Sequence, residues 1–198
     1  MSMPPPLITG KSSRGPVQKF VTVLAVTGAI FICLLVGLRI FGLVRLFSFS
    51  RNSMAPAIST GDHIVSEGFS FHGRNPRRGD IVIFKTDGLR FVTAPIYAKR
   101  IAGQPGERVQ ISDGKLYINN TLVVLSNVCG PIRNITPLPV WAADYKDNML
   151  VPSDQYFVLG DNSTNSLDSR YFGCVPAANI IGRAWMCYWP PRRSGFVK

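Results

Sequence analysis

The chain has 198 residues, and its 22 lysines and arginines outnumber 11 acidic residues to give a formal net charge of +11. The basic residues are scattered, with no run longer than two and no aromatic–basic repeat, which argues against a nucleic-acid partner and favours an anionic lipid surface. The four cysteines form no CxxC pair and show no metal-ligand spacing, so we expect neither a metal ion nor a cofactor.

The N-terminal part contains a long apolar run. Residues 1–18 are expected to be a disordered basic segment, whereas residues 19–40 are predicted to form a transmembrane anchor. From Phe20 to Leu38 no residue is charged, and as a helix this run spans about 28 Å, close to the hydrocarbon thickness of a bilayer. A cleaved signal peptide needs a shorter apolar core, and a buried soluble helix is seldom apolar on all faces, so we favour a retained anchor. Basic residues flank both ends in similar number and do not decide its orientation.

The rest of the chain carries mostly the periodicity of strands. Residues 41–49 alternate Phe and Leu with small or basic residues and are expected to lie in the membrane interface. Beyond them, short strand-like segments are separated by Gly/Pro turns, and no segment makes a long amphipathic helix. We therefore predict one mostly β domain over residues 48–190, a barrel or folded sheet. The predicted strands are 80–85, a hairpin around Asp113-Gly114, 155–162 and 180–189, with an extended loop or insertion at 126–148 and a loose basic tail at 191–198.

The stretch FSRNSMAPAI, which follows the apolar run closely, contains a candidate nucleophile, Ser53. A serine hydroxyl is a weak nucleophile at neutral pH and needs a partner that takes its proton. His63 and His72 fall at a strand start and in a turn, with no pattern that supports a Ser-His-Asp triad. A lysine is a base only when neutral, and burial among apolar groups favours the neutral form. Lys99 in APIYAKRIAG fits this requirement, whereas Lys85 ends its strand and is expected to be solvated.

Four segments carry a resemblance to a known family. SRNSMAP, RRGDIVIF, YAKRIAGQPGE and GDNSTNSLDSRYFGCVP occur in this order after the apolar run. Together they resemble the conserved boxes of type I signal peptidases, which are membrane-anchored Ser/Lys proteases that remove signal peptides. Each segment alone is a weak signal, but four in order are highly specific, and the resemblance extends over about residues 50–187.

The resemblance implies a role for each matching residue. Ser53 matches the nucleophile and Lys99 the general base. Ser166 matches a serine that hydrogen-bonds to that lysine and orients it, while Asp168 and Arg170 match a pair that braces the last box. The opening turn of that box matches Gly160, Asp161 and Asn162.

The family also implies a substrate and a location. The expected reaction is hydrolysis through an acyl-enzyme, with exported preproteins as substrates and small residues at positions −1 and −3 of the cleavage site. The expected fold is mostly β. The domain is expected on the extracytoplasmic face of the cytoplasmic (inner) membrane, held by a single transmembrane pass. The residues expected to line shallow apolar substrate pockets, although each suits plain core equally well, are Phe49, Met54, Ile83, Tyr97 and Ala98.

Two positions depart from the family pattern. Two places before the nucleophile, where many members carry serine or glycine, this chain has Arg51. Where that residue is serine, its hydroxyl helps the oxyanion hole, so we expect the Ser53 N–H to carry most of this role, with Arg51 or Asn52 adding one donor or none. Alternatively, Arg51 points to lipid headgroups. The loop containing Cys129 is the second departure, and we predict no disulfide there.

Two other functions remain as alternatives. One is a specialised Ser/Lys maturation peptidase of a conjugation or secretion system, which the order and completeness of the four segments disfavour. The other is a non-enzymatic anchored β domain, which the joint presence of Ser53, Lys99 and Ser166 disfavours.

Overall fold

The computed structural model describes residues 15–125, 130–134 and 148–198. The chain divides into two compact units, Met1–Phe41 and Gly42–Lys198. Within the first, α1 (Pro16–Ile40) is a helix with exposed apolar side chains along its length. Its stretch Pro16–Gly37 has a mean hydropathy of 2.6, so it is long and apolar enough to cross a membrane, a property that signal sequences share.

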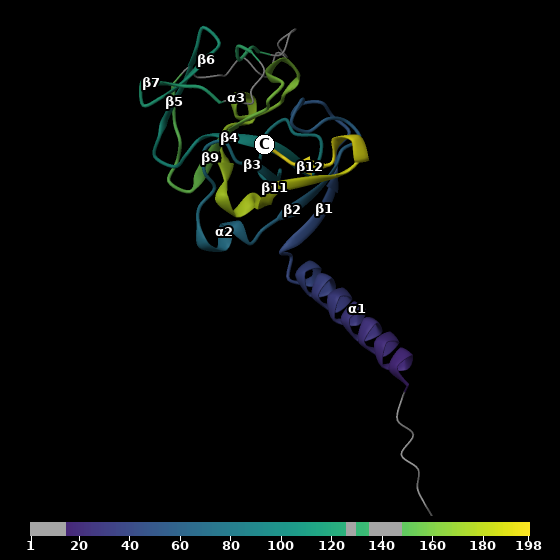
Figure 1. Cartoon of the computed structure of the whole chain (residues 1–198). Helices are drawn as coiled ribbons and strands as arrows, with labels where there is room; N and C mark the ends of the chain where they lie inside the picture. The colour runs from purple at the N-terminus through teal and green to yellow at the C-terminus, as the bar shows by residue number, and fades with distance from the viewer. Residues whose placement is uncertain (1–14, 126–129, 135–147) are drawn as a thin grey trace, which may run out of the picture. The chain divides into compact units, whose positions relative to one another are not determined.

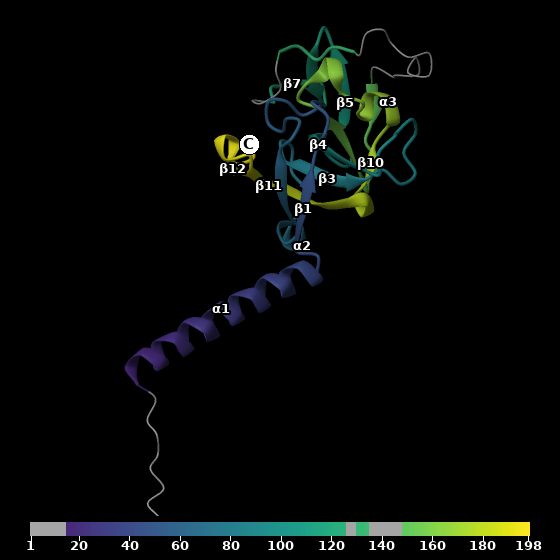
Figure 2. The ribbon, with the colours of Figure 1, turned by 90° about the vertical axis from the view of Figure 1, so that its right-hand side faces the viewer.

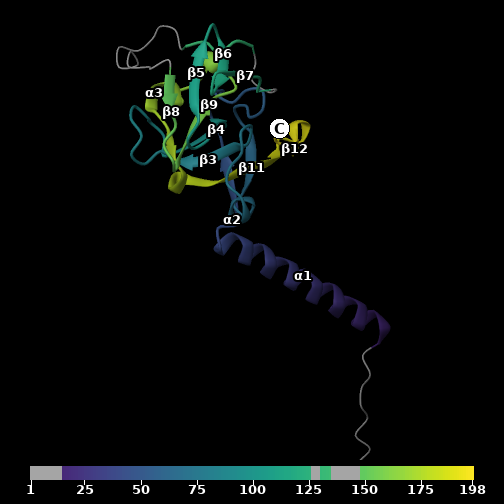
Figure 3. The same cartoon turned by 90° about the vertical axis from the view of Figure 1, so that its left-hand side faces the viewer.

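The larger unit is built on an antiparallel sheet, as the strand-like periodicity predicted. The sheet runs in the order β1-β2-β11-β3-β4-β9-β10, with β12 beside β11. Figure 3 shows β3, β4 and β9 as neighbouring strands, with the yellow β11 on the other side of β3. The strands are β1 (Val44–Ser48), β2 (His63–Glu67), β3 (Ile81–Lys85), β4 (Ile96–Gly103), β9 (Gln155–Leu159), β10 (Val175–Pro176), β11 (Ile180–Trp189) and β12 (Gly195–Phe196).

A second, smaller antiparallel sheet has the order β7-β6-β5-β8. It lies at the far end of the domain from β1 and β2 (Figures 1 and 2). The predicted hairpin joins β5 to β6, and its turn residues Asp113 and Gly114 have φ values of 50° and 72°, the positive values that a type I′ turn requires. The strands are β5 (Arg108–Ser112), β6 (Lys115–Ile118), β7 (Thr121–Val123) and β8 (Asn148–Leu150).

The helices of this domain are short, in agreement with the absence of a long amphipathic pattern. Each of the two described α-helices beyond residue 42 has four residues. They are α2 (Ser70–Gly73) and α3 (Ser169–Phe172), and the 3-10 turns are η2 (Ser163–Asn165), η3 (Ala177–Asn179) and η4 (Pro191–Arg193). The mostly β class predicted from the sequence is therefore confirmed.

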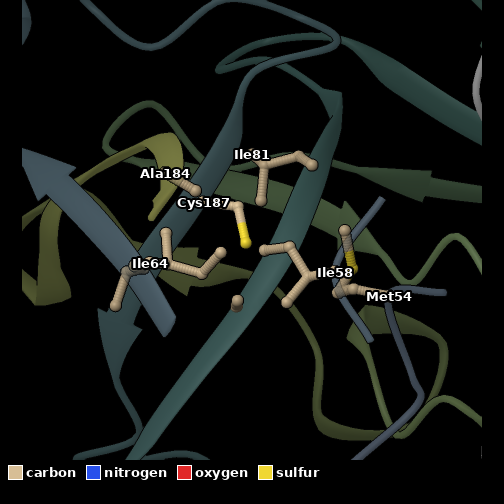
Figure 4. Packing of buried hydrophobic residues seen from close by; sticks show 8 residues of the cluster. Met54, Ile58, Ile64, Ile81, Ala184 and Cys187 are labelled. Carbon is tan, nitrogen blue, oxygen red and sulfur yellow. The ribbon is translucent and has the colours of Figure 1, made fainter. Parts of the chain in front are cut away.

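One part of the core ties a long loop to the large sheet. The loop from Ser48 to His63 joins β1 to β2, and two of its side chains, Met54 and Ile58, are only 2% and 1% exposed. Figure 4 shows them directed toward side chains from β2, β3 and β11. Burying such side chains stabilises the domain by about 1.5–3 kcal/mol each, so the loop is fixed by the core instead of lying free on the surface. The cluster consists of Met54, Ile58, Ile64, Ile81, Ile83, Ala98, Ala184 and Cys187.

The structure differs from expectation at both ends of the domain. Residues 44–48, expected in the membrane interface, form β1 and pair with β2 from Val44↔Glu67 to Ser48↔His63. Their alternation of Phe and Leu with other residues is the period of a strand. The tail at 191–198 is not loose, because η4 and β12 order it and the Phe196 ring lies 5.6 Å from that of Trp185.

Three expectations fall largely or wholly on residues that the structure does not describe. These are the disordered segment at 1–18, whose described residues 16–18 are helical and begin α1, most of the insertion at 126–148, and the state of Cys129. Within the described piece at 130–134, the Ile132 N–H donates to Gly114 O at 2.8 Å. The other cysteines, Cys33, Cys174 and Cys187, are free thiols.

Candidate active site

Ser53 lies at the start of the tight turn whose apolar side chains enter the core. Ala55 N–H donates to Asn52 O at 3.2 Å, and Ile58 N–H donates to Met54 O at 2.9 Å, so the backbone folds back on itself around the serine. The Asn52 side chain closes the turn by accepting from both the N–H and the hydroxyl of Thr60. The serine is therefore presented on a backbone that hydrogen bonds and buried side chains hold from both sides.

Lys99 comes to this serine from the middle of β4. It stands opposite Val82 of β3 and is only 3% exposed. Its Nζ lies 2.7 Å from Ser53 Oγ. Burial lowers the pKa of Lys99 from 10.5 to about 8, against an opposing attraction from Asp168 and Asp161. Thus a lysine that is half neutral near pH 8 contacts a serine hydroxyl, which is the pairing that general-base activation of a nucleophile requires.

Two residues of the segment after β9 hold the nucleophile's backbone. Asn162 N–H donates to Ser53 O at 3.1 Å, and Asn162 Nδ2 donates to Asn52 O, also at 3.1 Å. Gly160 packs so closely that an added Cβ would lie 2.6 Å from Ser53 O. Because a peptide unit is planar, fixing Asn52 O also fixes the direction of the Ser53 N–H on the opposite side. The resemblance matched Asn162 to a turn, but it did not predict that Asn162 hydrogen-bonds to the backbone of Asn52 and Ser53.

An ion pair connects the same segment to β4. Arg100, next to Lys99, donates to both carboxylate oxygens of Asp161 at 2.7 and 2.6 Å, and both side chains are buried. Arg100 also donates to Gly79 O at 2.7 Å. Breaking a buried pair of this kind by removing one partner costs about 3–5 kcal/mol, so the pair fixes the segment 160–162 against β4. No pattern in the sequence singled out Arg100.

Asp168 and Arg170 pair as the resemblance implies. Arg170 Nε donates to Asp168 Oδ1 at 2.8 Å, and Arg170 Nη2 donates to Asp168 Oδ2 at 2.9 Å. The second oxygen also accepts from Gly160 N–H at 3.0 Å, which links the pair to the turn behind Ser53. Ser166 differs from expectation. Its Oγ is buried and has no hydrogen-bond partner among the residues that the structure describes, since Lys99 Nζ is directed to Ser53 and the Ser166 hydroxyl packs against Gly160.

A cleft of about 750 Å³ opens over the Ser53–Lys99 pair. Four of the five residues expected to line it do so, namely Phe49, Met54, Tyr97 and Ala98. The fifth, Ile83, does not; it stands opposite Ala98 across the β3–β4 ladder, is fully buried, and packs in the core beneath the cleft. Lining residues that were not predicted include Leu46, Phe47, Ile58, Ile96, Leu167, Thr60 and Asn165.

Comparison with known proteins assigns the family. The family model described as "Signal peptidase, peptidase S26" matches residues 21–189. The chain belongs to this family. A probable signal peptidase I-2 of Synechocystis sp. is 34% identical to the chain over 191 residues, covering 96% of the chain and 83% of that relative. A signal peptidase I of Leptolyngbya laminosa is 37% identical over 147 residues, covering 72% and 68%. A probable thylakoidal processing peptidase 2 of Arabidopsis thaliana is 37% identical over 151 residues, covering 74% of the chain and 38% of that relative.

The other candidate bases lie elsewhere in the domain. Lys85 is exposed at the end of β3, as expected. His63 begins β2, and its Nδ1 lies 3.4 Å from Tyr188 Oη. Neither belongs to the described lining of the cleft. Among the candidate bases weighed from the sequence whose side chains the structure describes, Lys99 is thus the one placed against the serine.

Arg51, the departure from the family pattern, has a definite position in the signal peptidase. It lines the cleft, and its Nη2 donates to Thr93 Oγ1 at 3.3 Å. The side chain is therefore directed across the cleft to the loop that precedes β4, a contact between residues 42 positions apart. Asn52 uses its side-chain oxygen to accept from Thr60.

Proposed function

We propose that this protein is a membrane-anchored serine endopeptidase that removes signal peptides from exported preproteins through a Ser/Lys dyad. The observation that carries the proposal is the 2.7 Å contact between Lys99 Nζ and Ser53 Oγ at the floor of an accessible cleft. The lowered pKa of Lys99 supports it, because a base acts best when its pKa is near the working pH. Membership of the signal peptidase family supplies the reaction class.

The chemistry follows from the two side chains. Neutral Lys99 Nζ takes the proton of Ser53 as Oγ attacks the scissile carbonyl, and a tetrahedral oxyanion forms. The lysine ammonium then gives this proton to the leaving amine of the mature protein, which leaves the signal peptide as an ester on Ser53. Water attacks the ester, Lys99 takes its proton and returns it to Ser53 Oγ, and the signal peptide departs with a free carboxylate.

The oxyanion needs preorganised donors at the position where its charge develops. We assign this role to the Ser53 N–H, whose direction is set by the two hydrogen bonds that Asn52 O accepts, from Asn162 Nδ2 and Ala55 N–H. Arg51 stands where many family members carry the second donor, and its guanidinium contacts Thr93.

The apolar part of the cleft suits the small residues before the cleavage site. Phe49, Met54, Tyr97 and Ala98 provide the apolar surface beside the dyad. Bulky substrate side chains at positions −1 and −3 have little room against such a surface, whereas alanine fits. We propose these four residues as the wall of the substrate pockets.

The proposal is tested with the full-length protein purified in detergent and incubated with an exported preprotein. The wild type is expected to release the mature protein, whereas Ser53→Ala and Lys99→Arg are expected to be inactive. Arginine keeps the positive charge but does not act as a base, and Lys85→Arg serves as the matched control that retains activity. A Lys99→Arg enzyme that cleaves at the wild-type rate would rule out the dyad.

Two further measurements address the intermediate and the substrate range. Rapid acid quenching followed by mass spectrometry should find the signal peptide attached to Ser53, and persistent absence of this adduct during turnover would favour direct attack by water. A panel of unrelated preproteins should be cleaved. If only one specialised precursor is cleaved, the protein is a maturation peptidase instead.

The membrane and the face are part of the proposal. We propose that α1 crosses the cytoplasmic membrane once and that the β domain lies on the extracytoplasmic face, where exported preproteins emerge. Fractionation should place the protein with that membrane. Protease added outside spheroplasts should digest the β domain without lysis, and digestion that occurs only after lysis would reverse the orientation.

A further inference from the structure

The cleft over the dyad has an unbalanced charge. Among the described residues that line it, the charged ones are Arg51 and Lys99, and none is an aspartate or glutamate. Lys99 is buried and engaged with Ser53, so its charge is variable and used in the reaction. Arg51 is exposed and carries a permanent charge at the mouth of the cleft.

The Arg51 side chain is held over the cleft by the opposite wall. Its Nη2 donates to Thr93 Oγ1 at 3.3 Å, and the loop of Thr93 is itself anchored. Thr86 Oγ1 donates to Ala94 O at 2.8 Å, and Thr86 N–H donates to Pro95 O at 3.0 Å. Arg51 thus contacts the loop of Thr93, which the hydrogen bonds to Thr86 hold in place.

The guanidinium retains capacity for a ligand. It has five N–H donors in a planar fork, a geometry that matches a carboxylate. Its hydrogen bond to Thr93 uses one of these nitrogens on a neutral hydroxyl, and none of the ion pairs found within the described ranges involves Arg51. By contrast, Arg74, Arg183 and Arg193 are partly exposed arginines that each pair with a carboxylate.

The distance along the chain limits which part of a substrate Arg51 contacts. Arg51 is two residues from Ser53, so their Cα atoms are at most about 7 Å apart. We therefore expect the Arg51 guanidinium to contact substrate side chains within about three residues of the scissile bond. The residues before that bond are expected to be small at positions −1 and −3 and to occupy the apolar wall. Position −2 and the residues that follow the bond have no such apolar requirement.

We propose that Arg51 forms a subsite for an acidic side chain at position −2 or within the first three residues after the scissile bond, so that the enzyme prefers preproteins that carry aspartate or glutamate there and disfavours those that carry lysine or arginine. This inference rests on the proposed function and specifies its substrate class. It also gives Arg51 a role different from that of the hydroxyl it replaces.

The test measures kcat/KM for a peptide substrate that spans the cleavage site, with Glu, Gln or Lys placed in turn at positions −2, +1, +2 and +3. The full-length wild type in detergent at low salt should prefer Glu over Lys by about three- to tenfold at one or more of these positions, the range expected for a partly exposed charge pair and the matching repulsion. The preference should weaken at high salt, because exposed charges are screened.

Charge reversal provides the decisive comparison. Arg51→Gln should bring the Glu-to-Lys ratio to about one, and Arg51→Glu should invert it. Arg90→Glu is the matched control, since it makes the same charge change at an exposed arginine outside the described cleft lining, and it should keep the wild-type ratio. Any influence of Arg51 on Lys99 affects all peptides equally and cancels in the ratio.

The outcomes separate this inference from the proposed function. A wild-type enzyme that cleaves all peptides with a ratio near one at every position overturns the inference and leaves the proposed function intact. An Arg51→Glu enzyme that still prefers Glu does the same. If Arg51→Gln lowers kcat equally for every peptide while the ratio persists, Arg51 serves the oxyanion and not an acidic side chain. If the wild type cleaves no peptide, the proposed function fails and this inference with it.

Discussion

Lys99 should destabilise the fold at neutral pH, because it is a buried ammonium. Replacing it with methionine, which has a similar length and no charge, removes this effect. In the wild type the pKa of Lys99 is lowered from 10.5 to about 8, and burial is the main cause. A pKa lowered in the folded state means that the unfolded chain binds the proton more tightly, so the cost is largest at low pH.

The magnitude follows from the shift. Below pH 8 both states are protonated, and the full difference of about 3 kcal/mol separates Lys99→Met from the wild type, at 1.36 kcal/mol per pKa unit. As pH rises above the folded pKa, the folded state loses its proton first and the difference shrinks, to about 1 kcal/mol at pH 9.5. The wild type therefore gains stability relative to Lys99→Met between pH 8 and 10.5.

The assay is urea unfolding of the full-length protein in detergent, followed by tryptophan fluorescence at several pH values between 6.5 and 9.5. Lys85→Met is the matched control, since the exposed Lys85 ammonium stays in water in both states. The reasoning is refuted if Lys99→Met is less stable than the wild type at pH 7, or if the difference between the two stays constant over this range.

Other predictions concern the acylation rate and the two residues that hold the backbone at Ser53, Gly160 and Asn162. With a base of pKa about 8, single-turnover acylation should rise nearly tenfold from pH 6 to 7 and level off above about pH 9; a flat profile would exclude Lys99 as the base. Gly160→Ala should lose activity and stability together in turnover and urea assays, because the added Cβ would overlap Ser166 Oγ and lie 2.6 Å from Ser53 O. Asn162→Ala should lower kcat by about 10- to 100-fold with little change in KM, because it releases the peptide whose N–H we propose as the oxyanion donor; an effect on KM alone would contradict this.

The fold was largely predictable because its strands have a clear period. The hairpin at Asp113-Gly114 and the strands β3, β9 and β11 follow from local patterns of apolar residues and turn signals. The alternation in residues 44–48 was equally regular, but a strand and a membrane-surface segment both use exposed apolar side chains, and the partner strand β2 decides between them. The order of the tail depends on Trp185 and β11, which no local pattern reveals.

The site was predictable only in part, because its contacts join distant residues. Ser53 and Lys99 are 46 positions apart. Their contact was predicted from the four segments that resemble the signal peptidase boxes, and not from the residues adjacent to either side chain. Ile83 was assigned to the pocket because it is apolar, although the register of β3 and β4 places it opposite Ala98 and outside the cleft lining. Arg100 and Asp161 are 61 positions apart, and the sequence around each residue does not predict which residue it pairs with. Such long-range pairs need the register of the sheet before they become visible.

The Asp168–Arg170 pair has an electrostatic consequence beyond bracing the turn. Asp168 raises the pKa of Lys99 and Arg170 lowers it, so Arg170 offsets part of the attraction by which the Asp168 carboxylate favours the protonated lysine. Asp168→Asn should therefore shift the midpoint of the pH–rate profile downward, and Arg170→Gln should shift it upward. A purely structural role predicts loss of stability in both variants with no opposite shifts. Midpoints that move in the same direction, measured on the folded fraction of each variant, would contradict the electrostatic account.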